Sequence, residues 1–156
     1  MQKKLILTFA AGLALTAAAP SPQPAPATHR IIRAGDIVWG PAPATLPAGA
    51  QTALLYGNPA SDGLFAMRLK VPKGYQLPLH THPGKEIVTV LQGKVRLVVG
   101  SMANAAGAQP LTAGGFYSTE PGTPHTLLVD EDSVIQVNSR GPWGIDFVDP
   151  AKDPAR

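Results

Sequence analysis

The chain has 156 residues with 16 Gly, 17 Pro and no Cys, and it carries 13 basic against 10 acidic residues. This length suits a single domain, and Gly and Pro, about a fifth of all residues, favour many turns over long helices. The composition argues against a helical bundle, a coiled coil and a doubly wound nucleotide-binding fold, and the lack of Cys excludes disulfides, iron–sulfur clusters, thiolate zinc sites and cysteine nucleophiles.

The first segment, residues 1–19, has the pattern of a secretory signal peptide. Two lysines precede an apolar run over residues 5–15, and small residues follow at 16–19. An uncleaved membrane anchor is the alternative, but the run is short for a span of about 20 residues. We therefore expect a periplasmic or secreted protein without a stable membrane anchor, whose mature chain starts after Ala17 or later.

Residues 20–30 are rich in Pro and Ala, which predicts an extended tether between the signal and the folded domain. The domain itself is expected over residues 31–150, followed by a short tail at 151–156. Removing the signal with Lys3 and Lys4 takes the 13 basic residues to 11, against 10 acidic ones. No cluster of Lys or Arg stands out in the remainder, so we expect no nucleic-acid partner.

Short apolar runs separated by turn residues fill the domain and predict an all-β fold. The expected strands span residues 52–56, 64–71, 87–91, 94–99, 116–119, 126–129, 134–138 and 145–148. Gln92 and Gly93, between the third and fourth of these runs, indicate a tight hairpin. Gly107 favours a loop over residues 102–108. Many short strands with turns between them are typical of a sandwich or a small barrel.

Histidines are scarce, and two of the four, His80 and His82, are separated by one residue. In a strand over residues 76–82 their side chains point to the same face, about 7 Å apart along the backbone, so both imidazoles can converge on one ion. Glu86 can supply an anionic ligand after the next turn, and His125 a third imidazole after another. Such a set leaves open positions for water or substrate, although an isolated His pair is more often part of a core or a surface.

The same residues give the chain a resemblance to the cupin superfamily. The first cupin motif is a Gly, five residues, His-x-His, three or four residues, Glu, six residues and a Gly. Here Gly74, His80, His82, Glu86 and Gly93 fill every fixed position. This complete match favours ligands over a chance pair of histidines.

The second cupin motif matches only in part. It is a Gly, five residues, Pro-x-Gly-x-x-His, three residues and Asn. Gly114, Gly122 and His125 fit the pattern, whereas Glu120 stands where Pro is usual and Val129 where Asn is usual. The short segment between the two motifs is similar to that of compact bacterial cupins.

The resemblance implies a single-domain cupin-type jelly-roll barrel, a double-stranded β-helix. A divalent transition metal is then expected at His80, His82, Glu86 and His125, and the ligands do not choose among Fe, Mn, Ni, Co, Cu and Zn. A cupin that keeps the barrel without the metal is the alternative, but such proteins usually lack ligands and none is missing here. A homodimer is expected by resemblance alone.

Cupins with this ligand set include dioxygenases, decarboxylases, isomerases and proteins without a known reaction. The first hypothesis is therefore a metal-dependent enzyme, an oxidoreductase of the dioxygenase type, acting on a small organic molecule. The second is a non-catalytic protein that binds or senses a metal or a small ligand, and the third is a storage-like or structural barrel.

Other side chains have weaker assignments. Glu120 is the candidate catalytic acid or base, or else it caps the turn before His125. His29 falls in the tether and is expected to be solvated. Three aromatic side chains, Tyr75, Phe116 and Tyr117, either line a ligand pocket or only pack against their neighbours, as aromatic residues of strands more often do. Trp39 and Trp143 are expected to anchor the first and last segments.

Overall fold

The computed structural model describes residues 29–156. The expected signal peptide over 1–19 and most of the expected tether over 20–30 lie outside the described residues. Residues 32–156 form one compact unit. Within the described part of the chain, no helix has the length and apolar character needed to cross a membrane.

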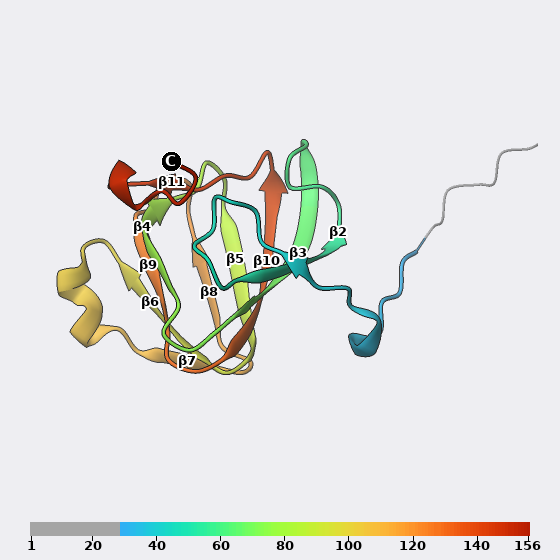
Figure 1. Cartoon of the computed structure of the whole chain (residues 1–156), viewed down its shortest axis with the longest axis horizontal. Coiled ribbons are helices and arrows are strands. Elements are labelled where there is room, and N and C mark those ends of the chain that lie inside the picture. The colour runs from blue at the N-terminus through green and yellow to red at the C-terminus, as the bar shows by residue number, and fades with distance from the viewer. Residues whose placement is uncertain (1–28) are drawn as a thin grey trace, which may run out of the picture. The chain divides into compact units, whose positions relative to one another are not determined.

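Two antiparallel sheets build this unit (Figure 1). The strands of the first sheet, in spatial order, are β1 (Gly40–Pro41), β2 (Gln51–Tyr56), β3 (Gly63–Val71), β10 (Ser133–Gly141), β5 (Glu86–Gln92) and β8 (Phe116–Thr119). Those of the second are β11 (Asp146–Phe147), β4 (Gln76–Thr81), β9 (His125–Val129), β6 (Lys94–Val99) and β7 (Pro110–Thr112). Short 3-10 helices are η1 (Ala34–Asp36), η2 (Met102–Gly107) and η3 (Pro150–Lys152). The all-β jelly-roll prediction is confirmed.

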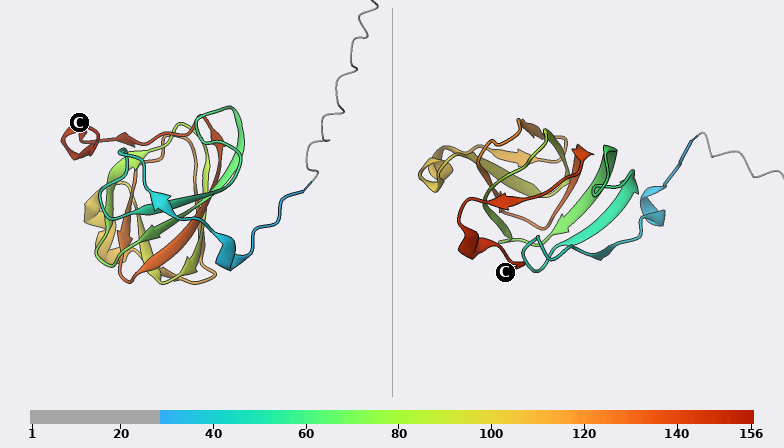
Figure 2. Two further views of the ribbon diagram at one scale, coloured as in Figure 1. Left: turned by 45° about the vertical axis from the view of Figure 1, so that its right-hand side comes forward. Right: turned by 90° about the horizontal axis from the view of Figure 1, so that it is seen from above.

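The core lies between the facing sheets, as Figure 2 shows from two further sides. On β3, every second residue is buried, because successive side chains of a strand point to opposite faces. Phe65, Met67 and Leu69 enter the core in this way, while the intervening Leu64 is exposed. Strand β10 pairs with β3 over its whole length, from Ser133 opposite Val71 to Gly141 opposite Gly63.

The hairpin expected at Gln92 and Gly93 is wrong. Strand β5 pairs with β10 and β8, whereas β6 pairs with β9 and β7, so the chain passes from one sheet to the other at this turn. The turn itself is tight: Gly93 has φ +80°, and a Cβ there would clash with the backbone carbonyl oxygen of Asp132. Turn residues mark where a strand ends, but they do not specify the sheet that the next strand joins.

The loop expected over residues 102–108 contains the 3-10 helix η2. Its Ala-rich sequence favours helical turns, and the side-chain amide of Asn104 fixes its start by donating a hydrogen bond to the carbonyl of Val99 (2.7 Å). Strands β1 and β7, which were not predicted, are short and have little apolar alternation. Strand β7 extends the second sheet by pairing Leu111 with Val95.

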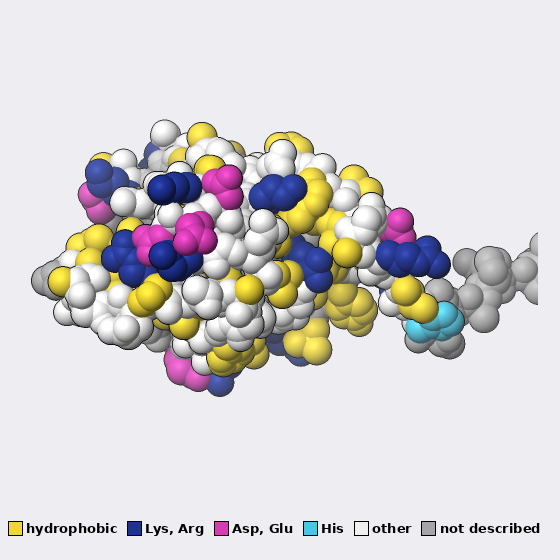
Figure 3. Space-filling model, turned by 90° about the horizontal axis from the view of Figure 1, so that it is seen from below, with side chains coloured by type: hydrophobic (Ala, Val, Ile, Leu, Met, Phe, Trp, Pro, Cys, Tyr) yellow, Lys and Arg dark blue, Asp and Glu magenta, His cyan; other side chains and the backbone are white. Residues whose placement is uncertain are grey.

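On the face drawn in Figure 3, basic side chains lie beside acidic ones rather than in one basic patch. One such pair elsewhere in the chain joins β6 to the turn before β10. Arg96 donates three hydrogen bonds to the carboxylate of Asp130, at 2.8, 2.9 and 3.2 Å, and these hold the pKa of Asp130 below its usual value.

Candidate metal centre

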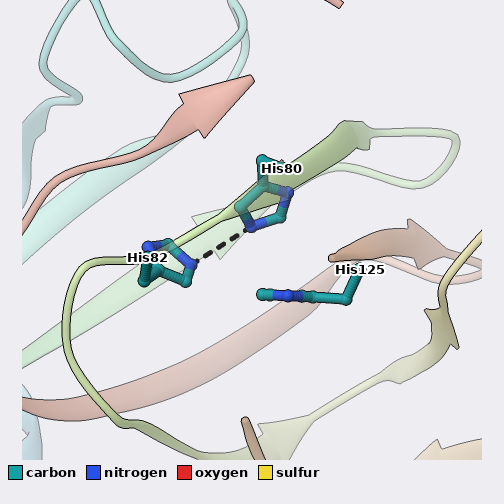
Figure 4. Close-up of side chains that lie close together, drawn as sticks. All are labelled: His80, His82 and His125. Atoms are coloured by element: carbon teal, nitrogen blue, oxygen red, sulfur yellow. Dashed lines mark hydrogen bonds between the residues drawn. The ribbon is translucent and has the colours of Figure 1, made fainter. Parts of the chain in front are cut away.

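Three histidines meet inside the barrel (Figure 4). His80 lies on β4, His82 directly follows that strand, and His125 begins β9. All three side chains are buried, with at most 2% of their surface exposed. One nitrogen of each imidazole lies within 4.8 Å of those of the other two, so together they could hold a metal ion.

An irregularity in the pairing of β4 with β9 places His80 in this group. Leu77 pairs with Leu127, so regular antiparallel pairing would place Leu79 opposite His125. His80 lies opposite His125 instead, which means that β4 carries one extra residue. Pro78 lies within this bulge, and proline has no N–H to donate to a neighbouring strand. Without the bulge, strict alternation would turn Leu79 rather than His80 toward His125.

The ring nitrogens are oriented by backbone carbonyls. Nδ1 of His80 lies 2.7 Å from the carbonyl oxygen of Pro78, Nδ1 of His82 lies 2.6 Å from that of Gly144, and Nδ1 of His125 lies 2.9 Å from that of Thr123. A carbonyl oxygen only accepts, so each Nδ1 carries the proton and donates it. In the neutral imidazole, Nε2 is then a free lone pair.

The three Nε2 atoms point toward a common region beside one carboxylate. Nε2 of His80 lies 3.1 Å from Nε2 of His82. The buried carboxylate of Glu86, the first residue of β5, has one oxygen 3.4 Å from Nε2 of His82 and the other 3.8 Å from Nε2 of His125. Two ligands about 2.1 Å from one ion at a right angle lie about 3.0 Å apart, which the His80–His82 spacing matches.

Comparison with known proteins assigns the family. The family described as "Cupin domain" matches residues 67–137, which include all three histidines and Glu86. Residues 67–137 of the chain form a cupin domain. No curated protein sequence matches it.

Solved structures show the same fold at low sequence identity. The polyketide cyclase RemF from Streptomyces resistomycificus is 16% identical with a TM-score of 0.65, covering 82% of this chain and 91% of its own. A candidate acetylacetone dioxygenase from Methylibium petroleiphilum PM1 is 23% identical (TM-score 0.64; 83% and 88% covered). The DMSP lyase DddQ from Ruegeria pomeroyi DSS-3 is 22% identical (TM-score 0.57; 73% and 62% covered).

Burial sets the charge state of the centre in this cupin. It lowers the pKa of His80 to about 3, with further lowering from His125 and His82, while the hydrogen bond to Pro78 acts in the opposite direction. Burial, with the nearby charge of Glu86, raises the pKa of Tyr117 well above its usual value. His80 is therefore neutral at physiological pH, and Tyr117 is a protonated phenol.

A cavity of about 20 Å³ lies beside the centre. His80, Glu86, His125 and Tyr117 form its polar side, and apolar core residues form the rest, with Trp143 among them. This volume is enough for about one water molecule. The cavity of the cupin is therefore too small, in this conformation, for an organic molecule.

The contribution of Trp143 was not predicted, because the sequence indicated only a structural anchor. Its indole stacks on the ring of His82, with centroids 5.1 Å apart and planes at 19°, and meets the ring of Phe65 nearly edge-on at 6.0 Å. The next residue, Gly144, supplies the carbonyl that orients His82. No local sequence signal could have found these contacts, because they join residues from 61 to 78 positions apart in the sequence.

The three other aromatic residues that could line a pocket occupy different environments in the structure. Tyr117 lines the cavity. The hydroxyl of Tyr75 donates a hydrogen bond to the carbonyl of Pro47 (3.2 Å), and Phe116 is exposed. Of these three residues, only Tyr117 therefore faces the candidate metal centre.

The structure places Glu120 at the surface, where its carboxylate lies 2.7 Å from Nζ of Lys85. Since an exposed ion pair contributes at most about 1 kcal/mol, Glu120→Gln is expected to change the free energy of unfolding by less than that and to leave metal content unchanged. Lys85→Gln, which removes the same pair, should have an equally small effect. Urea unfolding and metal analysis test this. Loss of turnover at full metal content would instead assign Glu120 the acid–base role.

Acid should destabilise the metal-free cupin through His80, which faces His82, His125 and Glu86. In the unfolded chain His80 binds a proton with a pKa near 6.5, whereas in the folded chain its pKa is about 3. Between these values the unfolded state binds one more proton, so stability falls as the pH falls, by up to about 1.4 kcal/mol per pH unit. Urea unfolding of wild type and His80→Gln from pH 6.5 to 4 measures this, and equal slopes for the two proteins would contradict it.

Proposed function

We propose that this cupin binds one divalent transition metal ion through His80, His82, Glu86 and His125. We further propose that it is a metal-dependent enzyme of the dioxygenase type that acts on a small organic molecule. The observation that carries the metal site is the shared orientation of the histidines, whose three Nδ1 atoms all donate to backbone carbonyls. Fixing the outer nitrogen in this way is how proteins orient metal-ligating imidazoles.

The short contact between His80 and His82 supports a cation at this position. With both Nδ1 atoms protonated, the two Nε2 lone pairs face each other at 3.1 Å and cannot hydrogen-bond while both rings are neutral. Burial opposes protonation of His80, whose pKa is lowered to about 3. A metal ion would accept both lone pairs at once and relieve their repulsion.

Glu86 supports the same assignment through its charge. A buried carboxylate is costly unless a positive charge compensates it, and the side chains paired with the Glu86 carboxylate are His82 and His125. Three neutral imidazoles and one carboxylate suit a divalent transition metal. Glu86 would then act as the anionic ligand and lower the net charge of the centre.

When bound, a divalent metal ion supplies a Lewis acid that polarises a substrate oxygen and, where the metal is redox-active, the capacity for dioxygen chemistry. The protein contributes the other elements. The carbonyls of Pro78, Thr123 and Gly144 hold the rings in position, and the apolar core excludes bulk water. The phenol of Tyr117 stays protonated beside Glu86 and is suited to donate a hydrogen bond to a ligand in the cavity.

A reconstitution experiment tests both parts of the proposal. Protein stripped of metal is loaded anaerobically with Fe(II), Mn(II) or Zn(II), and the bound metal is counted. Oxygen consumption is then followed with a panel of small neutral ketones and diketones. We expect one ion per chain and consumption that requires a redox-active metal. If no metal binds stoichiometrically, the metal site is wrong; if metal binds without turnover on any substrate, the enzyme assignment fails.

A non-catalytic protein that binds or senses a metal or a small ligand is the second candidate function. The small cavity of about 20 Å³ favours it, because in this conformation the centre admits little more than one water molecule. Such a protein would bind its ion and show a ligand-dependent change in stability without any product. Thermal unfolding with and without candidate ligands distinguishes it from the enzyme.

We also propose that the protein is exported to the periplasm or secreted. The support is the lysine-led apolar run over residues 5–15 and the small residues after it. Mass spectrometry of the envelope fraction is expected to find a mature chain lacking at least residues 1–17. An intact N-terminus in the cytoplasmic fraction would reject export.

A homodimer is proposed on the outer face of the first sheet. On that face, Leu64 of β3 pairs with Arg140 of β10, and Ile87 of β5 pairs with Asn138 of β10. The side chains of both Leu64 and Ile87 are exposed. Phe116 adds a third exposed apolar side chain on β8. Apolar side chains gathered on one surface are typical of protein interfaces. Light scattering is expected to give twice the chain mass, and a monomer at micromolar concentration would contradict this.

A further inference from the structure

An apolar pocket of about 280 Å³ lies next to the metal centre, on the other side of Trp143. We call it the Trp143 pocket. None of its lining residues is charged, and the ones that carry the argument are Leu54, Ala60, Met67, Trp143 and Gly144. Its volume is close to the lower end of the range for small-molecule sites, about 300–1,000 Å³.

The pocket opens on the inner face of the first sheet. Leu54 on β2 pairs directly with Met67 on β3, so both side chains lie on one face. Met67 belongs to the core, yet 48% of Leu54 is exposed. The inner face at β2 is therefore left partly uncovered, and an apolar side chain lies there without full burial.

Trp143 connects this pocket to the metal centre. It lines both the pocket and the central cavity, and its indole stacks on the ring of His82. Its indole nitrogen is buried without a hydrogen-bond partner in the protein. Gly144 also lines the pocket, and its backbone carbonyl accepts a hydrogen bond from Nδ1 of His82. A molecule in the pocket would thus contact the two residues that position one histidine.

We infer that the Trp143 pocket binds the apolar part of a neutral small organic molecule and that the Trp143 indole separates this molecule from the metal centre. The lack of lining charge disfavours an ionic ligand, because a charged group would lose its hydration without compensation. The volume disfavours a macromolecule. That the molecule is the substrate rests on the proposed function, whereas its binding in the pocket does not.

Trp143 fluorescence reports on the pocket directly. The chain has two tryptophans, so Trp39→Phe leaves Trp143 as the single indole. This protein, metal-free and zinc-loaded, is titrated with benzyl alcohol, and with benzylammonium and benzoate as charged probes of similar size. We expect a saturable fluorescence change with benzyl alcohol in both forms, and binding of the charged probes at least about tenfold weaker because of their desolvation cost.

Two variants in the same background locate the binding. Leu54→Lys puts a charge at the pocket, and Ala60→Phe fills it from an exposed position. Each is expected to weaken benzyl alcohol binding at least about tenfold. Met102→Lys is the matched control, because Met102 is as exposed as Leu54 (48%) but lies on η2, outside the lining of the pocket, and it should change binding less than about twofold. Circular dichroism verifies that each variant is folded.

The outcomes separate the pocket from the metal site. Wild-type affinity in both pocket variants, an equal loss in Met102→Lys, or no saturable change at all would overturn the pocket. Metal content is measured in the same preparations. Intact benzyl alcohol binding in a protein that retains no ion would uphold the pocket and reject the metal centre. A full ion content without binding of benzyl alcohol would uphold the metal centre and reject the pocket.

Discussion

Replacing His80 or His125 with Ala is expected to abolish stoichiometric metal binding while leaving a folded barrel. Each change removes one of three convergent imidazoles. Loss of an outer hydrogen-bond partner alone costs about 10–100-fold in metal affinity, so loss of a ligand should cost more than about 100-fold. Metal analysis after dialysis against a weak chelator measures the effect, and His82→Ala should behave in the same way.

His29→Ala is the control for this experiment, because His29 is not in the buried histidine group. It should keep one ion per chain. Chelation should also lower the melting temperature of the wild type, since an ion at about 100 times its Kd stabilises the folded state by about 2.7 kcal/mol. Full occupancy in the His80 and His125 variants together with loss in His29→Ala would show that the metal site lies elsewhere.

Much of the barrel could be predicted because its strands have one buried face. The alternation along residues 64–71 indicates a strand. In the structure, β3 of the first sheet buries every second side chain of this run in the core between the two sheets. Which sheet each strand joins could not be predicted. The turn at Gly93 reads as a hairpin because a hairpin and a passage between sheets need the same tight turn.

The candidate site, like the barrel, could be predicted from the sequence only in part. The histidines follow from their spacing and from the cupin motif, and the structure brings His80, His82 and His125 together. The extra residue that turns His80 inward has one trace in the sequence, Pro78, because a proline inside a strand is confined to edges and bulges; the spacing of the histidines alone does not reveal it. The support of His82 by Trp143 likewise depends on how the segment after β10 packs, which only long-range contacts determine.

Phe65→Ala is expected to lower the free energy of unfolding by about 3–5 kcal/mol, because it deletes a large buried ring and leaves a cavity. Only 2% of Phe65 is exposed, and its ring packs against the edge of Trp143. The indole would lose one of its two ring contacts and hold His82 less firmly. We therefore expect weaker metal binding as well as lower stability, and urea unfolding and metal titration measure the two effects.

Met102→Ala is the matched control, because Met102 is an exposed apolar side chain on η2, outside the core. Its effect on stability should stay within about 0.5 kcal/mol, with metal affinity unchanged. Phe65→Leu separates the two roles of the ring: it fills much of the volume but offers no aromatic surface to Trp143. If Phe65→Leu keeps most of the stability yet binds metal more weakly, the Phe65–Trp143–His82 contacts support the centre. If metal affinity follows stability alone in both variants, Phe65 acts only through the core.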